Sequence, residues 1–295
     1  MTERTDEIGG GAARANKFDS SKPNVARVYD YLLGGKDNFA ADRQAAERLV
    51  AALPNAAAVA RANRAFLAAA VRHVAGEGIG QYLDIGAGLP TAPSVHECAR
   101  AIVPGARVAY VDNDPVAVSH AQALLATGDG VIATEGDARE PAAILDDPAL
   151  AGVIDLAEPV CVLLVSMLHF FTAEEADMIV GTVRERLVPG SYLIISQGNS
   201  NGGRNDRVQN AYGRDVTLTG RTDAEIAAYF DGFDLVPPGL VPVTEWHAGE
   251  PDAQLSYLPR VPRPARLPQP AASSAGSPPG SPQAGMLAGV GRKRP

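Results

Sequence analysis

The stretch QYLDIGAG, residues 81–88, joins a short apolar run to two closely spaced glycines, Gly86 and Gly88. The run predicts a buried strand, and the glycines predict a tight turn at which a ligand approaches the backbone. Dinucleotide-binding enzymes use a similar turn, but LPT at residues 89–91 replaces their third glycine here. The carboxylate of Asp84 would also repel a pyrophosphate. The turn therefore favours a cationic ligand, such as one with an ammonium group.

Two further acidic residues follow later in the chain, each just after a predicted strand. Asp112 lies 24 residues after Gly88, close to the spacing of about 20 residues at which an acid binds ribose hydroxyls. Asp137 follows the next strand, where its side chain would accept a hydrogen bond from an adenine amino group. A single acid in such a place is most often a solvated loop residue. Three acids at the carboxyl ends of successive strands predict a shared ligand crevice.

Short runs rich in Val, Ile and Leu alternate with helical patterns, as is typical of parallel strands covered on both faces. Helix start signals lie between the runs, namely Asp114 before Pro115 and capping boxes that begin at Thr172 and Thr222. The alternation predicts an α/β fold with a doubly wound, Rossmann-like sheet. The predicted strands span residues 81–85, 107–111, 131–135, 160–165 and 191–196.

The remaining segments predict a helical cap before the sheet and a last strand after it. Residues 1–20 are polar, and we expect them to be mobile. Helical patterns over residues 42–53 and 55–75 predict a cap or lid within residues 21–78, with Asn55 capping the second helix and Gly76 beyond its end. The core spans residues 79–260, and residues 261–285 are a Pro-rich flexible loop. Residues 286–290, within the segment 286–295, predict an edge strand that returns to the sheet.

The composition of the 295-residue chain argues against several classes of protein. Its formal net charge of −8 disfavours a nucleic-acid partner, which requires a basic surface. No apolar run reaches the ~20 residues that cross a bilayer, so we expect no membrane partner. The two cysteines, Cys98 and Cys161, form no disulfide framework or metal motif. We therefore expect no metal and assign the chain to the cytoplasm. The sequence leaves the oligomeric state unknown.

Three further residues are candidates for the site. The fourth predicted strand runs into Ser166 and His169, which face the same crevice. His169 is a candidate general base, and the alternative is a structural histidine packed beside the cofactor. Asn63 falls on the apolar face of the second helix, between Val59 and Phe66. A buried amide needs a partner, so Asn63 either bonds to local backbone or helps to cover a cofactor.

Several strings of the chain, taken in order, resemble an actinobacterial family of S-adenosylmethionine-dependent methyltransferases that was long known as a domain of unknown function. The resemblance implies a class I methyltransferase fold, with a seven-stranded, mostly parallel sheet whose last strand is antiparallel. It also implies S-adenosyl-L-methionine as the cofactor. The strings are ARVYDYLLGGKDNFAADR (26–43), RANRAFL (61–67), YLDIGAGLPTAPSVHE (82–97), VDNDP (111–115), VLLVSMLHF (162–170) and GVGRK (289–293).

The resemblance assigns parts of the cofactor to three strand ends. The turn reads GAG where GTG is common in the family, which removes no functional group. We add Asn63 and Ser166 to the cofactor-binding set. By similarity, the methionine part would lie at Asp84, Gly86 and Gly88, the ribose at Asp112, and the adenine at Asn113, Asp137 and Ala138.

The sequence thus predicts an enzyme that transfers a methyl group to a small-molecule acceptor, which it does not identify. One alternative is a non-catalytic, regulatory protein that binds S-adenosylmethionine. A dinucleotide-dependent oxidoreductase is the other, and the missing third glycine counts against it.

Residues 25–39 have two interpretations. As a lid, they would close over the crevice by flexing at Gly34 and Gly35, with Lys36 directed at the acceptor. As static packing, they would place Tyr29 and Phe39 in the core.

Overall fold

The short apolar runs form the parallel sheet that the sequence predicts. A computed structural model describes residues 19–199, 206–213, 216–246 and 285–295. The described strands make one sheet in the order β3-β2-β1-β4-β5-β8-β6, with β7 paired to β8. Strands β1 to β5 pair in parallel, whereas β8 is antiparallel to β5, β6 and β7. The bounds are β1 Gln81–Ile85, β2 Arg107–Asp112, β3 Val131–Glu135, β4 Cys161–Val165, β5 Tyr192–Asn199, β6 Phe233–Leu235, β7 Val241–Pro242 and β8 Gly285–Lys293.

The helices begin where the capping residues predict. The side chains of Asp114, Thr172 and Thr222 each accept a hydrogen bond from a first-turn backbone amide. Asn55 is the N-cap residue of α3, as predicted, although its side chain makes no cap hydrogen bond. The predicted end of α3 is wrong by one residue, since Gly76 is its last helical residue. The helices are α1 Val25–Leu33, α2 Ala40–Ala52, α3 Ala56–Gly76, α4 Val95–Arg100, α5 Pro115–Leu124, α6 Pro141–Leu145, α7 Pro148–Ala151, η1 Leu168–Phe170, α8 Ala173–Arg186, α9 Asp206–Tyr212 and α10 Asp223–Ala228.

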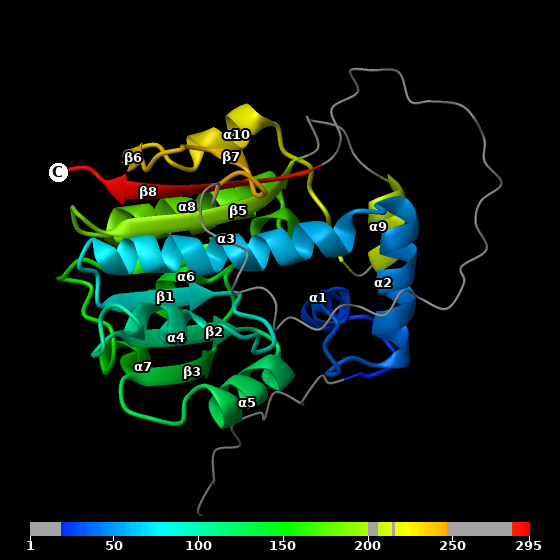
Figure 1. Cartoon of the computed structure of the whole chain (residues 1–295), viewed down its shortest axis with the longest axis horizontal. Coiled ribbons are helices and arrows are strands. Elements are labelled where there is room, and N and C mark those ends of the chain that lie inside the picture. The colour runs from blue at the N-terminus through cyan, green and yellow to red at the C-terminus, as the bar shows by residue number, and fades with distance from the viewer. Residues whose placement is uncertain (1–18, 200–205, 214–215, 247–284) are drawn as a thin grey trace, which may run out of the picture.

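Helices cover both faces of the sheet, because successive strand residues point to opposite sides. Tyr82 packs with Val71 of α3 in one apolar cluster, whereas Leu83 packs with Ile179 of α8 in the other. Figure 1 shows α3 crossing the near face of the sheet, with the arrowheads of β1 and β2 directed toward α1 and α2. The carboxyl ends of the parallel strands therefore lie beside the N-terminal helices.

Strand β8 lies inside the sheet, so the prediction of an edge strand is wrong. It pairs with β5 on one side and with β6 and β7 on the other. Its residues Ala288 and Val290 are fully buried. The backbone groups of β8 form hydrogen bonds to strands on both of its sides. Strand β8 therefore joins β6 and β7 to the parallel strands.

The N-terminal helices α1 and α2 pack with α9 around a small apolar cluster that includes Val28 and Leu49. A buried ion pair ties α1 to α2, with Arg27 Nε 2.8 Å from Asp42 Oδ2. Asp42 also accepts the backbone amides of Asn24 and Phe39, at 2.8 Å each. The Asp42 carboxylate therefore fixes how the chain enters both helices. The ARVYDYLLGGKDNFAADR string thus has a structural role in this cap.

The two glycines that follow α1 are held in place. Gly34 ends α1 in the left-handed region, at φ 86°. A Cβ on Gly35 would overlap the Asp30 carboxyl, which also accepts the Asn38 side-chain amide at 2.8 Å. These contacts make the pair a tight, bonded turn and give no support to a flexible joint.

Helix α3 belongs to both the cap and the core. Its first turns reach α1, whereas Phe66 and Val71 are fully buried in the cluster on the sheet. The loop was predicted at residues 261–285, but Gly285 is the first residue of β8, and residues 261–284 lie outside the described residues. Residues 1–18 of the predicted mobile segment 1–20 also lie outside them. No helix among the described residues has the length and apolar character needed to cross a membrane.

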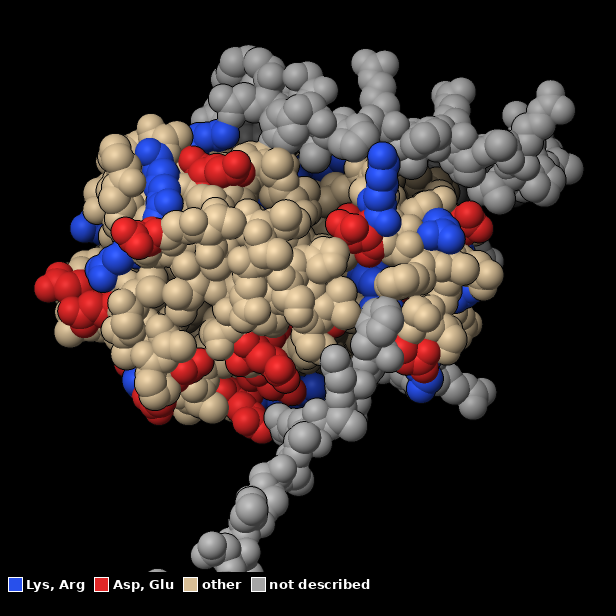
Figure 2. Space-filling model, turned by 90° about the horizontal axis from the view of Figure 1, so that it is seen from below, with Lys and Arg blue, Asp and Glu red and all other residues tan. Residues whose placement is uncertain are grey.

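Figure 2 shows one face of the molecule, seen from below the view of Figure 1. Basic and acidic side chains are interspersed there around a wide central area without charged residues. The described residues on this face form no continuous basic strip of the kind that follows a nucleic-acid backbone. The absence of a nucleic-acid partner stays a prediction.

Candidate active site

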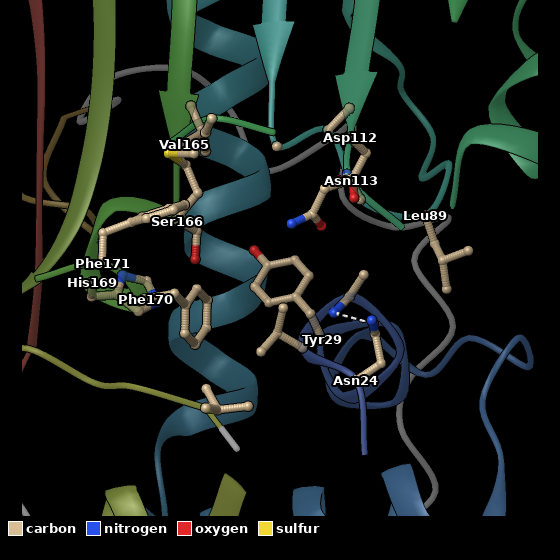
Figure 3. A pocket seen from close by; sticks show the side chains of 18 of the residues that line it. Asn24, Tyr29, Leu89, Asp112, Asn113, Val165, Ser166, His169, Phe170 and Phe171 are labelled. Atoms are coloured by element: carbon tan, nitrogen blue, oxygen red, sulfur yellow. Dashed lines mark hydrogen bonds between the residues drawn. The ribbon is translucent and has the colours of Figure 1, made fainter. Parts of the chain in front are cut away.

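The carboxyl ends of β1, β2, β3 and β4 surround a cavity of about 450 Å³, which α1 and α3 complete on the remaining side. Its volume falls within the ~300–1,000 Å³ typical of small-molecule sites. Figure 3 shows Tyr29 projecting from α1 between Asp112 and Asn113 on one side and Ser166 and His169 on the other. The predicted residues that line this cavity are Asn63, Asp84, Gly86, Gly88, Asp112, Asn113, Ala138, Ser166 and His169.

The glycine turn after β1 has the backbone conformation that the sequence predicts. Gly86 and Gly88 have φ of 75° and 66°, values that L side chains rarely adopt. A Cβ on Gly86 would lie 3.2 Å from the Cβ of Met167, so a side chain there would crowd the loop after β4. The Gly86 amide donates to the Val111 carbonyl at 2.8 Å, which ties the turn to β2. The turn therefore presents backbone directly to the cavity.

Asp84 is a buried carboxyl group on the wall of the cavity, 6% exposed. Burial raises its pKa to about 7, the Arg64 charge opposes this rise, and Asp112 adds to it. The contacts within the described residues include no hydrogen bond to this carboxyl. A buried carboxylate without partners is costly, and a cationic ligand would compensate it.

Asp112 occupies the end of β2 and braces the neighbouring loops. Its Oδ2 accepts the Gly88 amide at 2.7 Å, and its Oδ1 accepts the Asp114 amide at 2.9 Å. Burial raises its pKa, and these backbone hydrogen bonds oppose the rise. Each carboxylate oxygen can accept a further hydrogen bond in addition to these. Asn113 follows at the rim of the cavity, where its side chain is exposed.

Asn63 is 1% exposed on α3, and its Nδ2 donates to the Tyr29 hydroxyl at 2.9 Å. The Tyr29 hydroxyl in turn donates to the Ala60 carbonyl at 3.1 Å. The Asn63 Oδ1 atom is buried and has no hydrogen-bond partner among the described residues. Asn63 is therefore held by the side chain of Tyr29 and not by local backbone, and it lines the cavity with an unused acceptor. Its contact with a cofactor stays a prediction.

Arg64 is a site residue that the sequence reasoning missed. Its Nη2 donates to the carbonyls of Thr91 and Pro93 at 2.9 and 2.8 Å, and its buried Nε lacks a partner among the described residues. The spacing of Asn63, Arg64 and Leu67 places all three on one helical face. All three line the cavity. Their spacing on α3 was therefore the sequence signal from which Arg64 could have been predicted as a site residue.

Asp137 stands apart from the other predicted residues. Its neighbours Gly136 and Ala138 line the cavity, whereas its own carboxylate pairs with Arg139, with Oδ2 2.9 Å from Nη2. Both side chains are partly exposed. The predicted contact between Asp137 and an adenine amino group stays a prediction.

The loop after β4 supplies Ser166 and His169. Ser166 has φ of 57°, an uncommon value for a residue other than glycine, which is often associated with functional sites. Burial and the nearby Arg221 charge lower the pKa of His169 to about 4. The imidazole is therefore neutral near pH 7 and acts as a hydrogen-bonding group or a weak base.

Aromatic residues from separate parts of the chain close the cavity. Phe170 and Tyr212 pack edge to face with centroids 5.7 Å apart, and both line the cavity with Tyr29. Tyr212 comes from α9, so only the tertiary structure identifies it. In the described part of the chain, no group of three or more His, Cys, Asp or Glu side chains is arranged to hold a metal.

Comparisons with known proteins show the family and the fold of the chain. A crystal structure from Thermobifida fusca, described as a candidate methyltransferase, is 37% identical with a TM-score of 0.78 and covers 94% of this chain and 97% of its own. A DUF574 family protein from Streptomyces avermitilis is 36% identical with a TM-score of 0.78, covering 93% of this chain and 99% of its own. The search of curated proteins gave no match. Residues 11–294 match the model of the S-adenosyl methyltransferase family. The chain therefore belongs to the S-adenosyl methyltransferase family, with the class I methyltransferase fold.

Proposed function

We propose that this protein transfers the methyl group of S-adenosyl-L-methionine to a small-molecule acceptor. One observation carries the proposal. The cavity at the strand ends contains a buried carboxyl, Asp84, and a buried acceptor, Asn63 Oδ1, neither of which has a hydrogen-bond partner among the described residues. A cationic, hydrogen-bond-donating ligand would compensate the charge of the Asp84 carboxylate and supply the donor that Asn63 Oδ1 lacks. The cofactor's ammonium group satisfies this requirement.

The other lining residues suit the rest of the cofactor. The unpaired Nε of Arg64 is a donor for the methionine carboxylate. The remaining acceptor capacity of Asp112 fits ribose hydroxyls. Asn113 and Ala138, at the ends of β2 and β3, would adjoin the adenine.

The bound cofactor supplies an activated methyl group on a sulfonium centre. The protein's part is to orient the acceptor and exclude water, which supplies much of the rate in such a displacement. Tyr29, Phe170 and Tyr212 provide the apolar enclosure. His169 is the candidate group for the acceptor's proton. A small acceptor fits this enclosed geometry better than a macromolecule does.

Cys98 and Cys161 are buried free thiols, which supports a reducing compartment such as the cytoplasm.

Calorimetry with S-adenosylhomocysteine and with NAD tests the proposal. We expect the purified chain to bind S-adenosylhomocysteine and to show no comparable affinity for NAD. Asp84→Asn should weaken binding at least about ten-fold, since hydrogen bonds to charged groups contribute about 1.5–3 kcal/mol. The matched control is Asp146→Asn, which removes an exposed carboxylate paired with Arg186 on the surface and should leave affinity unchanged. Tight NAD binding without S-adenosylhomocysteine binding would contradict the proposal.

Transfer is tested separately from binding, with a methyl-labelled cofactor and a panel of small acceptors. Label in a product extracted into organic solvent would support an enzyme. Cofactor binding without labelled product across the panel would favour the non-catalytic, regulatory alternative.

A further inference from the structure

A second cavity, of about 190 Å³, adjoins the first beneath the helical cap. Tyr29, Ser166, His169 and Tyr212 line both cavities and form their common wall. We propose that the second cavity binds the methyl acceptor, and that the acceptor is a small, flat, apolar molecule with one hydroxyl group, such as a phenol. This inference rests on the proposed function, because the first cavity must hold the cofactor.

The lining of the second cavity selects against charged acceptors. Among the described residues that line it, none is Lys, Arg, Asp or Glu. Nucleotides, phosphorylated sugars and charged peptide side chains would lose their hydration there without compensation. An uncharged, largely apolar molecule therefore fits best. The apolar part of the lining is drawn from α1, α2, α3, α9 and β8, and it includes Leu32, Leu49, Leu53, Val59, Val208 and Met286.

Three amide side chains belong to the lining. Asn55 is exposed where α3 begins, and the other two, Gln209 and Asn199, are already engaged. Gln209 accepts the Leu218 amide and donates to the Gly213 carbonyl, both at 3.0 Å. Asn199 donates to Asp223 at 2.8 Å and accepts the Gly285 amide at 2.9 Å. These amides shape the wall and have little capacity left for a ligand.

His169 differs from them because its Nδ1 is buried without a partner among the described residues. A Cβ placed on Gly198 would lie 3.9 Å from this nitrogen, and Gly198 lines only the second cavity. The nitrogen therefore lies beside the wall of the second cavity, at a point where Gly198 has no side chain to cover it. An acceptor with one hydroxyl would satisfy it, since a neutral imidazole accepts a hydrogen bond through its unprotonated nitrogen.

The charges near His169 favour a hydroxyl over an ammonium group. Arg221 is 2% exposed, and its guanidinium donates to the carbonyls of Leu168 and Thr172 at 3.1 and 2.8 Å. The Arg221 charge also lowers the pKa of the carboxyl groups of Glu174 and Glu225. Both of these side chains are exposed at the surface. A positive charge this close disfavours a cationic acceptor and stabilises a hydroxyl oxygen that is losing its proton.

The common wall favours a planar molecule. Three of its four members, Tyr29, His169 and Tyr212, carry rings, and rings pack well against the face or edge of another ring.

In the transfer step, an oxygen lone pair of the acceptor forms the new bond to the methyl carbon. The carbon–sulfur bond breaks, and its electron pair stays on sulfur. The hydroxyl proton passes to His169, which takes it despite a low pKa because an oxygen that gains a methyl group becomes strongly acidic.

Binding of 2-naphthol to the protein saturated with S-adenosylhomocysteine tests this assignment. Naphthalene, which has the same rings and no hydroxyl, is the matched probe. We expect 2-naphthol to bind about ten-fold more tightly than naphthalene, the factor given by one ordinary hydrogen bond. His169→Phe should abolish that preference and leave naphthalene binding in place. If 2-naphthol does not bind, or binds no more tightly than naphthalene, the assignment is overturned.

Filling the second cavity gives a test of location. Ala56 and Val59 line only this cavity and lie on the first two turns of α3. Ala56→Phe, and separately Val59→Phe, should weaken 2-naphthol binding at least ten-fold. S-Adenosylhomocysteine binding should be unchanged, which also shows that each variant is folded. Unchanged 2-naphthol binding in both folded variants would place the acceptor elsewhere. If the wild-type protein itself does not bind S-adenosylhomocysteine, the proposed function is refuted instead.

Discussion

Replacing Asp84 by Asn should stabilise the ligand-free protein above neutral pH while weakening cofactor binding. The carboxyl's pKa rises from 3.8 to about 7 in the folded protein, chiefly because the group is buried. At about 1.4 kcal/mol for each pH unit, ionising it in the folded state costs about 4 kcal/mol. The folded state holds the proton more tightly than the unfolded state does. Stability is therefore lost as pH rises from about 4 to about 7, and the loss stays constant above that range.

Asparagine does not ionise, so the variant avoids this cost. Denaturant unfolding without ligand should show Asp84→Asn more stable than wild type by up to about 4 kcal/mol at pH 8. The same linkage leaves a gain of about 1 kcal/mol at pH 4.5. The exposed control Asp146→Asn should show no comparable gain at pH 8. Calorimetry on the same samples should show weaker S-adenosylhomocysteine binding by Asp84→Asn alone.

The reasoning fails if Asp84→Asn is equally or less stable than wild type at pH 8. Such a result would mean that the carboxylate has stabilising partners in the free protein and is not held ready for a cationic ligand. A gain of equal size at both pH values would instead point to packing, because a packing effect does not follow the ionisation of the carboxyl.

Asp112→Ala should weaken S-adenosylhomocysteine binding by about 1–3 kcal/mol, since the Gly88 amide and the ribose both lose an acceptor. Unchanged affinity by calorimetry would show that the ribose lies elsewhere. Asp42→Ala should destabilise the fold by about 3–5 kcal/mol in denaturant unfolding, because buried Arg27 loses its nearest carboxylate and the amides of Asn24 and Phe39 lose their acceptor. A loss below 1 kcal/mol would mean that solvent reaches Arg27. Removing residues 286–295 deletes interior strand β8, and circular dichroism should then show no cooperative unfolding transition. A truncated chain that melts like the full chain would refute the sheet order.

The sequence by itself determined those features that depend on neighbouring residues. Short runs rich in Val, Ile and Leu predicted the five parallel strands to within a few residues, because the composition of such a run is a local property. The capping boxes at Thr172 and Thr222 and the turn at Gly86 were likewise predictable, since each hydrogen bond or backbone angle is set within four residues. The order of strands along the chain then brought Asp84 and Asp112 to one cavity.

Tertiary structure alone decided what depends on residues distant in sequence. Strand β8 lies between β5 and β6, a place that its own residues do not specify because a short apolar strand fits an edge or an interior position equally. Whether Nδ1 of His169 finds a hydrogen-bond partner depends on the residues packed around it, among them Gly198. These residues are distant in the sequence, so no local pattern predicts that the partner is missing. The wall of the second cavity combines Tyr212 of α9 with Tyr29 of α1 and with His169, residues that are distant in the sequence. Local patterns placed the cofactor's candidate contacts, whereas long-range packing made the space for an acceptor.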